Sequence, residues 1–209
     1  ALVLIEELRN RGFEVEALDL GGGFGSDYTV GQAPAAKDYA KAIVPMLAGK
    51  GLKLILEPGR SIAANAAILV AKVLYNKKGG EKNFVIVDAA MNDLLRPSIY
   101  QAFHLAWPVK SPGLPNGAAL ADDSPLNDKN LGEHPTTYDV VGPICESGDY
   151  FALGRKLPKM NEGELLCIFS AGAYGYTMAS NYNTRGRPAE VIVDGDKYWV
   201  SRQREEIED

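Results

Sequence analysis

The first sixty residues alternate short apolar runs with longer amphipathic stretches. Residues 1–10 and 34–47 carry apolar side chains at helical spacing, which predicts two helices. Residues 15–20 (VEALDL) and 52–56 (LKLIL) are short apolar runs, which predict buried strands. Strand, helix and strand with short connections favour parallel strands joined by a right-handed crossover. This part of the chain therefore predicts an α/β unit.

From residue 63 onward, short runs typical of strands replace this rhythm. They cover residues 68–75, 84–88, 103–109, 137–141, 164–169, 190–193 and 197–201. Asp194 and Gly195, between the last two runs, are a hairpin signal. Residues 202–209 predict a terminal helix. We therefore divide the chain into an α/β part, residues 1–62, and an all-β domain, residues 63–209.

Two further segments have a distinct character. Residues 110–135 are rich in Pro, Gly, Asn and Asp, which predicts a long exposed loop. The helical pattern of residues 1–10 has no capping residue before it, so we expect the chain to be a piece of a longer polypeptide.

Charge and composition exclude several classes of function. Lys and Arg number 22 against 27 Asp and Glu, a formal net charge of −5, which disfavours nucleic acid or an anionic membrane as partner. No apolar run approaches the ~20 residues that a membrane-spanning helix needs. Cys145 and Cys167 are the only cysteines and form no CxxC pair, which favours a reducing cytoplasm. His104 and His134 stand alone, so no metal is expected.

Three consecutive glycines follow the first predicted strand. Gly21, Gly22 and Gly23 would let the backbone approach an anion and offer several N–H groups to it. A dinucleotide fingerprint fails, because Ser26 stands where the third glycine is required. We favour phosphate binding at the carboxyl end of a barrel strand over a simple glycine turn.

The next predicted strand ends in a charged motif, Glu57-Pro58-Gly59-Arg60. Because the carboxyl ends of neighbouring parallel strands share one edge, we expect this motif to lie beside the glycines. An exposed surface ion pair between the glutamate and the arginine is the alternative.

Residues 87–104 (VDAAMNDLLRPSIYQAFH) contain Arg96 and Tyr100, four residues apart. On one helix face they could hold a carboxylate by charge and hydroxyl. From spacing alone, a solvated arginine beside a half-buried tyrosine is the favoured interpretation.

Two later segments also carry reactive groups. Cys145 and Glu146 lie in a loop flanked by Gly and Pro and can offer a proton donor and an anion together. Cys167 lies inside a predicted strand and is expected to be a small core residue. Residues 171–183 mix small and aromatic side chains in a pattern that suits neither a plain helix nor a plain strand. Tyr174 is an exposed candidate there, with aromatic packing as the alternative.

Five stretches in a fixed order together resemble the diaminopimelate decarboxylases, which belong to the pyridoxal-phosphate enzymes of fold type III, the alanine racemase and ornithine decarboxylase group. The stretches are LDLGGGFG (18–25), EPGR (57–60), VDAAMNDLLRPSIYQAFH (87–104), VGPICESGD (141–149) and ASNYNTRGRPAEV (179–191). The resemblance implies the C-terminal part of a TIM-like (β/α)8 barrel over residues 1–62. A β-sandwich or β-barrel domain would follow over residues 63–209.

The resemblance also implies roles for individual residues. Contacts to pyridoxal 5'-phosphate would come from Gly21, Gly22, Gly23, Glu57, Pro58, Gly59, Arg60 and Tyr174. Contacts to the substrate would come from Arg60, Arg96, Tyr100, Glu146 and Tyr174. The active site would lie at a homodimer interface and be shared between subunits, and Cys145 of one subunit would protonate the carbanion in the other.

The activity implied is decarboxylation of meso-2,6-diaminopimelate to L-lysine and CO2, the last step of lysine biosynthesis. Glu146 follows Cys145 where ornithine-type enzymes have an aspartate, which favours a substrate with two amino-acid heads. A decarboxylase of the ornithine or carboxynorspermidine type and a non-catalytic assembly module stay open. The lysine that binds the cofactor has no counterpart here, so we expect this chain to need the missing N-terminal barrel segment for activity.

Overall fold

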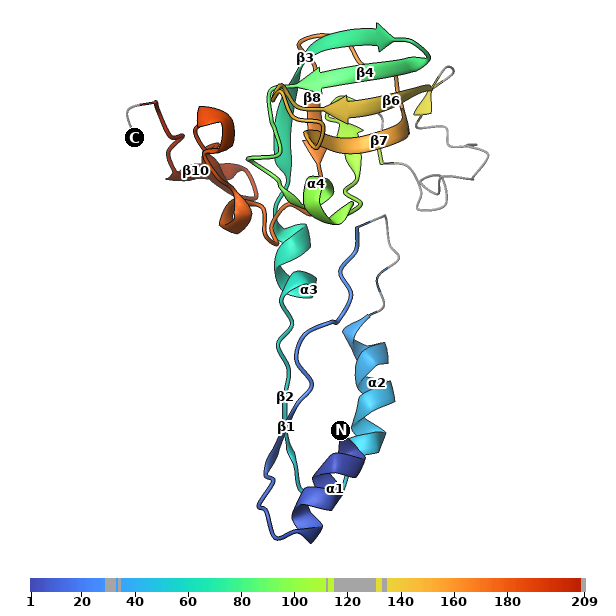
Figure 1. The fold of residues 1–209 in the computed structure, drawn as a ribbon, viewed down its shortest axis with the longest axis vertical. Coiled ribbons are helices and arrows are strands. Elements are labelled where there is room, and N and C mark those ends of the chain that lie inside the picture. The colour runs from blue at the N-terminus through green and yellow to red at the C-terminus, as the bar shows by residue number, and fades with distance from the viewer. Residues whose placement is uncertain (29–32, 34, 112, 115–130, 133–134, 208–209) are drawn as a thin grey trace.

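The computed structural model describes residues 1–28, 33, 35–111, 113–114, 131–132 and 135–207. It places a curled sheet at one end and the α/β unit at the other (Figure 1). No helix in the described part of the chain combines the length and the apolar character required to cross a bilayer.

The α/β unit contains two helices and two parallel strands. Its elements are α1 (Leu2–Asn10), β1 (Ala17–Asp19), α2 (Ala36–Leu47) and β2 (Lys53–Ile55). Strand β1 pairs with β2 in parallel, as the sequence predicts. Both strands are shorter than their apolar runs: the paired residues are Ala17–Asp19 of β1 and Lys53–Ile55 of β2.

The apolar faces of the α/β unit are largely uncovered within the described residues. No residue of α2 is buried, and Val44 and Met46 are exposed. Every residue of β2 is exposed, including Leu54 and Ile55. Burial in a packed core is the usual source of strand stability, so this unit contributes little core of its own.

Two short helices, α3 (Arg60–Ala63) and η1 (Ala64–Ala66), connect the α/β unit to a six-stranded sheet. The strands of this sheet are β3 (Leu69–Gly79), β4 (Lys82–Val87), β5 (Ala106–Pro108), β6 (Thr136–Val141), β7 (Tyr150–Leu157) and β8 (Leu165–Ile168). Their order is β5-β8-β3-β4-β6-β7, and only the β4–β6 pair is parallel. The sheet curls until its edge strands β5 and β7 come into contact, which makes a nearly closed barrel.

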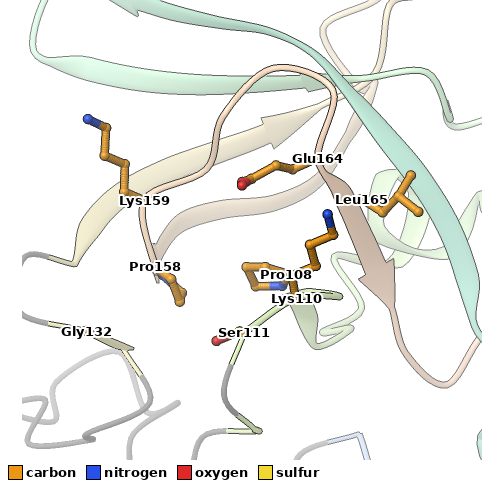
Figure 2. A pocket seen from close by; sticks show the side chains of 8 residues that line it. All are labelled: Pro108, Lys110, Ser111, Gly132, Pro158, Lys159, Glu164 and Leu165. Atoms are coloured by element: carbon orange, nitrogen blue, oxygen red, sulfur yellow. The ribbon is translucent and has the colours of Figure 1, made fainter.

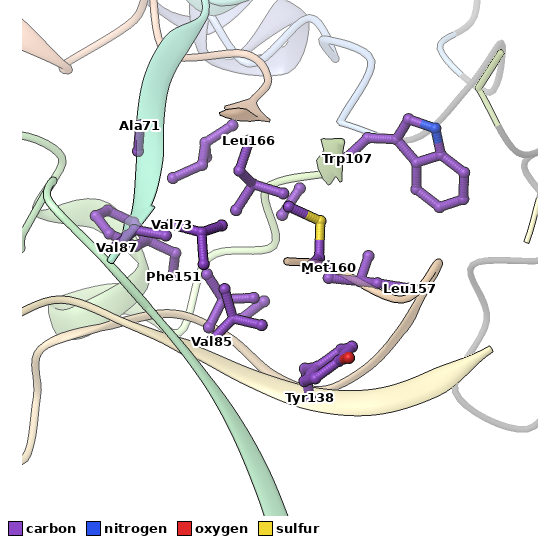
Figure 3. Packing of buried hydrophobic residues seen from close by; sticks show 14 of the residues in the cluster. Ala71, Val73, Val85, Val87, Trp107, Tyr138, Phe151, Leu157, Met160 and Leu166 are labelled. Carbon is purple, nitrogen blue, oxygen red and sulfur yellow. The ribbon is translucent and has the colours of Figure 1, made fainter. Parts of the chain in front are cut away.

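The hydrophobic core fills the inside of this curled sheet (Figure 3). Alternate residues of neighbouring strands point into it, including Val73 of β3 and Val85 of β4. Met160 and Leu166 are almost fully buried in the same cluster. This packed domain is the rigid support for the site described below.

Strand β7 is one element that the sequence pattern missed. Its residues YFALGRKL do not alternate cleanly between apolar and polar side chains, because Gly154 and two basic residues interrupt the pattern. In the structure Gly154 lies in the left-handed region at φ +59°. The Gly154 amide donates to the Asp139 carboxylate at 2.7 Å, so a side chain stabilises the irregularity.

The C-terminal hairpin is confirmed, whereas the terminal helix is wrong. Strands β9 (Glu190–Asp194) and β10 (Lys197–Arg202) pair antiparallel around the predicted turn. Residues 203–207 form no helix. The Glu205 carboxylate instead accepts hydrogen bonds from Asn181 and Arg187, which holds this segment against the preceding turns.

Two predictions remain untested. The predicted loop over residues 110–135 lies mostly outside the described residues. The division of the chain at residue 62 stays a prediction.

Candidate functional site

The three glycines lie at the edge where β1 ends, next to the end of β2. The Glu57 amide donates to the Gly21 carbonyl at 2.9 Å, which continues the parallel pairing beyond both strands. Gly21 and Gly23 have φ values of +65° and +83°, which glycine adopts at little cost. The two strand-end motifs therefore lie side by side, as predicted.

Gly22 is required by close packing. A Cβ built there would lie 2.8 Å from the Glu57 carbonyl oxygen, closer than real contacts allow. The amides of Gly22 and Gly23 have no acceptor among the described residues. A close backbone turn with free N–H groups is the arrangement that a phosphate ester requires, so these residues fit such a group.

The charged side chains of the second motif are exposed beside this turn. The Glu57 Oε2 atom is near Gly21, since a Cβ there would come within 3.9 Å of it. Pro58 and Gly59 form the exposed connection that follows, and Arg60 opens helix α3. The predicted cofactor contacts of these residues stay predictions.

Arg96 is buried, and its contacts in the described part of the chain are with neutral groups. It begins the short helix α4 (Arg96–Tyr100) and is only 7% exposed. Its Nη1 atom donates to the Tyr28 hydroxyl at 2.8 Å and lies 3.2 Å from Nε2 of His104. The ring centroids of Tyr28 and Tyr174 lie 5.1 and 5.9 Å from its guanidinium carbon. The cluster therefore holds a positive charge, the Arg96 guanidinium, with which an anion could pair.

Tyr100 is not part of that cluster in this structure. It is 62% exposed, whereas Arg96 is buried, and no contact joins the two side chains in the described chain. Helix α4 is only five residues long, and Gln101 leaves it in the left-handed conformation. The short helix therefore presents Tyr100 to solvent.

A small hydrogen-bonded junction fixes the glycine segment to the sheet domain. The Asp27 carbonyl accepts Asn65 Nδ2 at 2.6 Å and Ser170 Oγ at 3.0 Å. Since Tyr28 is the next residue, this junction sets its hydroxyl against Arg96. The end of the glycine segment and the buried guanidinium thus belong to one region.

The loop that carries Cys145 and Glu146 is organised by Asp149. The buried Asp149 carboxylate accepts the backbone N–H of Ile144 and that of Met91, each at 2.7 Å. Burial raises the pKa of Asp149, although both N–H bonds act to lower it. Cys145 is a free, exposed thiol.

Glu146 is exposed and lies near the turns after β8. Its Oε1 accepts the Gly148 amide at 3.2 Å, and the Tyr182 hydroxyl is 3.5 Å from its Oε2. No hydrogen bond or ion pair in the described chain joins Glu146 to Arg96. The roles predicted for Cys145 and Glu146 stay predictions.

The segment of residues 171–183 forms turns and two 3-10 helices, η4 (Tyr176–Met178) and η5 (Tyr182–Thr184), as its irregular pattern indicates. Tyr174 lies there at φ +65° and is 48% exposed. An aromatic residue in the left-handed region is unusual, and the site holds it near Arg96.

The last motif of the chain fixes the first half of the segment 87–104. Arg185 donates from Nε to the Asn92 side-chain oxygen at 3.1 Å and from Nη2 to the Asp88 carbonyl at 2.5 Å. The Ser180 amide donates to the Asn92 carbonyl at 2.9 Å. These contacts hold in place the segment that leads to Arg96.

The sequence assigned no structural role to three residues that prove important. Tyr28 and His104 contact Arg96, and Asp149 fixes the loop of Cys145. His104 and Asp149 end the stretches 87–104 and 141–149, so their position in those motifs was the available signal. Tyr28 carried none, because its contact with Arg96 spans 68 residues.

A separate depression of about 220 Å³ lies between Pro108, Lys110, Lys159 and Glu164 (Figure 2). It is found at the end of β5 and the start of β8. His104 and Phe169 lie at the opposite ends of these two strands. This depression is therefore not continuous with the cluster around Arg96.

The nearly closed mixed sheet that carries the buried arginine is matched by a known family of proteins. A family model for the C-terminal sheet domain of the pyridoxal-dependent decarboxylases matches residues 18–172. The chain belongs to this family.

Within it, the chain is similar to diaminopimelate decarboxylases. It is 47% identical to the diaminopimelate decarboxylase of Pseudomonas aeruginosa over 208 residues, which are 100% of this chain and 45% of that protein. The crystal structure of the Helicobacter pylori enzyme complexed with L-lysine has a TM-score of 0.80 at 38% identity and covers 99% of this chain and 46% of its own. The M. jannaschii enzyme with L-lysine gives 0.82 at 36% identity, covering 99% and 44%. The chain thus spans about half the length of these relatives.

Proposed function

We propose that this chain is the C-terminal part of a diaminopimelate decarboxylase, which converts meso-2,6-diaminopimelate to L-lysine and CO2 with pyridoxal 5'-phosphate. The observation that carries the proposal is the buried Arg96 guanidinium, which has no carboxylate partner among the described residues. A buried charge without a counterion is costly, and a substrate with a second carboxylate would supply one. The similarity to diaminopimelate decarboxylases over the whole chain supports the same substrate.

The residues at the β1–β2 edge would hold the cofactor. The amides of Gly22 and Gly23, which have no acceptor among the described residues, would donate to its phosphate. Glu57 would face the ring nitrogen, where a carboxylate favours the protonated ring. Arg60 and Tyr174 would add a cation and an aromatic contact. When bound, pyridoxal phosphate supplies an acceptor for the electron pair that departing CO2 leaves at Cα.

Other residues would recognise and protonate the substrate. Arg96, with Tyr100 and Arg60, would bind carboxylate groups, and Glu146 would bind the distal ammonium. The Cys145 thiol would give a proton to Cα, the role of a general acid. We assign this thiol to the site of a partner subunit in a homodimer.

The parallel β1–β2 pair would belong to a TIM-like (β/α)8 barrel completed by an N-terminal segment that carries the lysine for the cofactor. In that arrangement the apolar faces of α2 and β2 would be covered by neighbouring barrel strands and helices. We also propose that the complete protein works in the cytoplasm in lysine biosynthesis.

A substrate panel tests the proposal. The complete protein with pyridoxal phosphate is assayed for CO2 release from meso-diaminopimelate, ornithine and carboxynorspermidine. We expect a kcat/KM for diaminopimelate at least about a hundredfold above the others, because a poor substrate would leave buried polar groups of the site unpaired. Preference for ornithine or carboxynorspermidine would favour the related decarboxylases. No CO2 release from any of the three compounds would favour a non-catalytic assembly module.

A further inference from the structure

The hydrogen bonds of His104 allow only one form of its ring. The side chain is fully buried, with Nδ1 at 2.8 Å from the Phe169 carbonyl and Nε2 at 3.2 Å from Nη1 of Arg96. A carbonyl oxygen only accepts and a guanidinium only donates. Nδ1 must therefore carry the proton, and Nε2 must present its lone pair. The ring is neutral in this arrangement.

Neutrality of this partner matters for the charge on Arg96. The contacts of the guanidinium with the described residues are all uncharged: the His104 ring, the Tyr28 hydroxyl and the aromatic faces of Tyr28 and Tyr174. In the described part of the chain, no carboxylate forms an ion pair with it. The guanidinium is thus oriented without being neutralised.

We propose that His104 is a positioning residue: its neutral ring fixes the Arg96 guanidinium and leaves the full positive charge for a carboxylate of the substrate. An aspartate or glutamate in its place would orient the arginine equally well but would cancel the charge. The inference deepens the proposed function and rests on it for the identity of the substrate.

The competing explanation is a purely structural role, in which His104 only links α4 to the turn after β8. Burial lowers the pKa of His104, and the Arg96 charge lowers it further, so a neutral ring is compatible with both explanations. Substitutions that keep one hydrogen bond and lose the other separate them. His104→Gln keeps an acceptor near the Nε2 position, whereas His104→Asn keeps a donor near Nδ1. His104→Glu keeps the acceptor and adds a negative charge.

The experiment measures kcat, KM for diaminopimelate and melting temperature of the complete protein loaded with pyridoxal phosphate. For His104→Asn we expect KM to rise about tenfold, the value of one hydrogen bond to a charged group, with a smaller change in kcat. His104→Gln should raise KM less than His104→Asn. His104→Glu should raise KM most, although its melting temperature is no lower than that of His104→Asn.

Two results would overturn the inference. In one, the three variants share the wild-type KM and differ only in melting temperature. In the other, His104→Glu binds the substrate as well as His104→Gln does.

A second measurement does not depend on enzymatic activity. It is nitrogen NMR of the complete protein, labelled with nitrogen-15 at its histidines, at about pH 7.5, one unit above the ordinary pKa of histidine. The His104 signal is assigned from its loss in His104→Gln. We expect the neutral ring protonated at Nδ1, and a charged ring or the other tautomer would contradict the inference. If the wild type does not decarboxylate diaminopimelate, the proposed function fails, while this measurement still reports on His104.

Discussion

The Asp149 carboxylate accepts the backbone N–H of Met91 at 2.7 Å and so ties together two loops that are 58 residues apart in the chain. Its other oxygen accepts the Ile144 N–H, next to Cys145. One buried side chain thus fixes the loop of the proposed general acid relative to the segment that leads to Arg96.

The substitution Asp149→Asn should therefore lower the free energy of unfolding. An amide offers one acceptor, and its NH2 group would face a backbone N–H, so we expect a loss of about 2 kcal/mol. Urea unfolding of the complete protein measures this, with the exposed Glu162→Gln as control. A loss equal to that of the control would show that the two N–H bonds contribute nothing.

Gly22→Ala should impair cofactor binding. The new methyl group would lie 2.8 Å from the Glu57 carbonyl oxygen, so the backbone at the proposed phosphate site must shift. We expect the Kd for pyridoxal phosphate to rise at least tenfold, a penalty of about 1.4 kcal/mol. The control is Gly51→Ala, where φ is +60° but a Cβ meets nothing. Equal cofactor affinity in the two variants would contradict a close-packed phosphate turn.

Cys145→Ala should slow turnover without changing the cofactor. A positioned general acid contributes about a hundredfold or more to rate, and the exposed thiol makes no core contact that its loss would disturb. The visible absorbance of the loaded protein should stay normal while kcat falls. Cys167→Ala is the matched control, since that thiol is half-buried in β8 and burial raises its pKa. Wild-type turnover in Cys145→Ala would remove this thiol from the mechanism.

Arg96→Lys should weaken substrate binding more than cofactor binding. Lysine retains the charge but cannot reproduce the planar fork that meets a carboxylate and His104 together. We expect KM for diaminopimelate to rise about tenfold or more, with the Kd for pyridoxal phosphate near that of the wild type. Tyr100→Phe should raise KM without loss of stability, because that side chain is exposed. If substrate and cofactor affinity fall together in Arg96→Lys, the variant is misfolded rather than altered in recognition.

Acid should release the segment after β10. The Arg187 amide, the Arg187 guanidinium and the Asn181 side chain lower the pKa of Glu205 from 4.5 to about 2. Because the folded-state pKa is depressed, the stabilisation is complete above pH 4.5 and is lost as pH falls toward 2. Glu205→Gln should flatten the pH dependence of stability in this window, as measured by thermal unfolding. An unchanged profile would show that the carboxylate bonds do not persist in solution.

The sequence predicted the elements with clear periodicity better than the contacts between them. The parallel pairing of β1 and β2 and the hairpin of β9 and β10 followed from apolar runs and turn residues. Strand β7 was missed, because Gly154 and the two basic residues after it interrupt the alternation of apolar and polar residues that identifies a strand. The terminal helix was wrong, because Glu205 contacts distant residues that no local pattern reveals.

The site shows the same division. The glycines and Glu57 could be placed together, since the ends of parallel strands share an edge. The burial of Arg96 could not be predicted from its spacing to Tyr100. Its partners are Tyr28 and His104, and Tyr28 lies far away in the chain. Tertiary contacts decide which of two residues four apart faces the interior.

The open apolar surfaces of α2 and β2 have a practical consequence for anyone who makes residues 1–209 by themselves. Unpaired strand edges and exposed apolar helix faces promote self-association. Such a preparation should therefore precipitate or form soluble aggregates, which size-exclusion chromatography detects. Charged substitutions at Val44 and Met46 should delay this without touching the curled sheet.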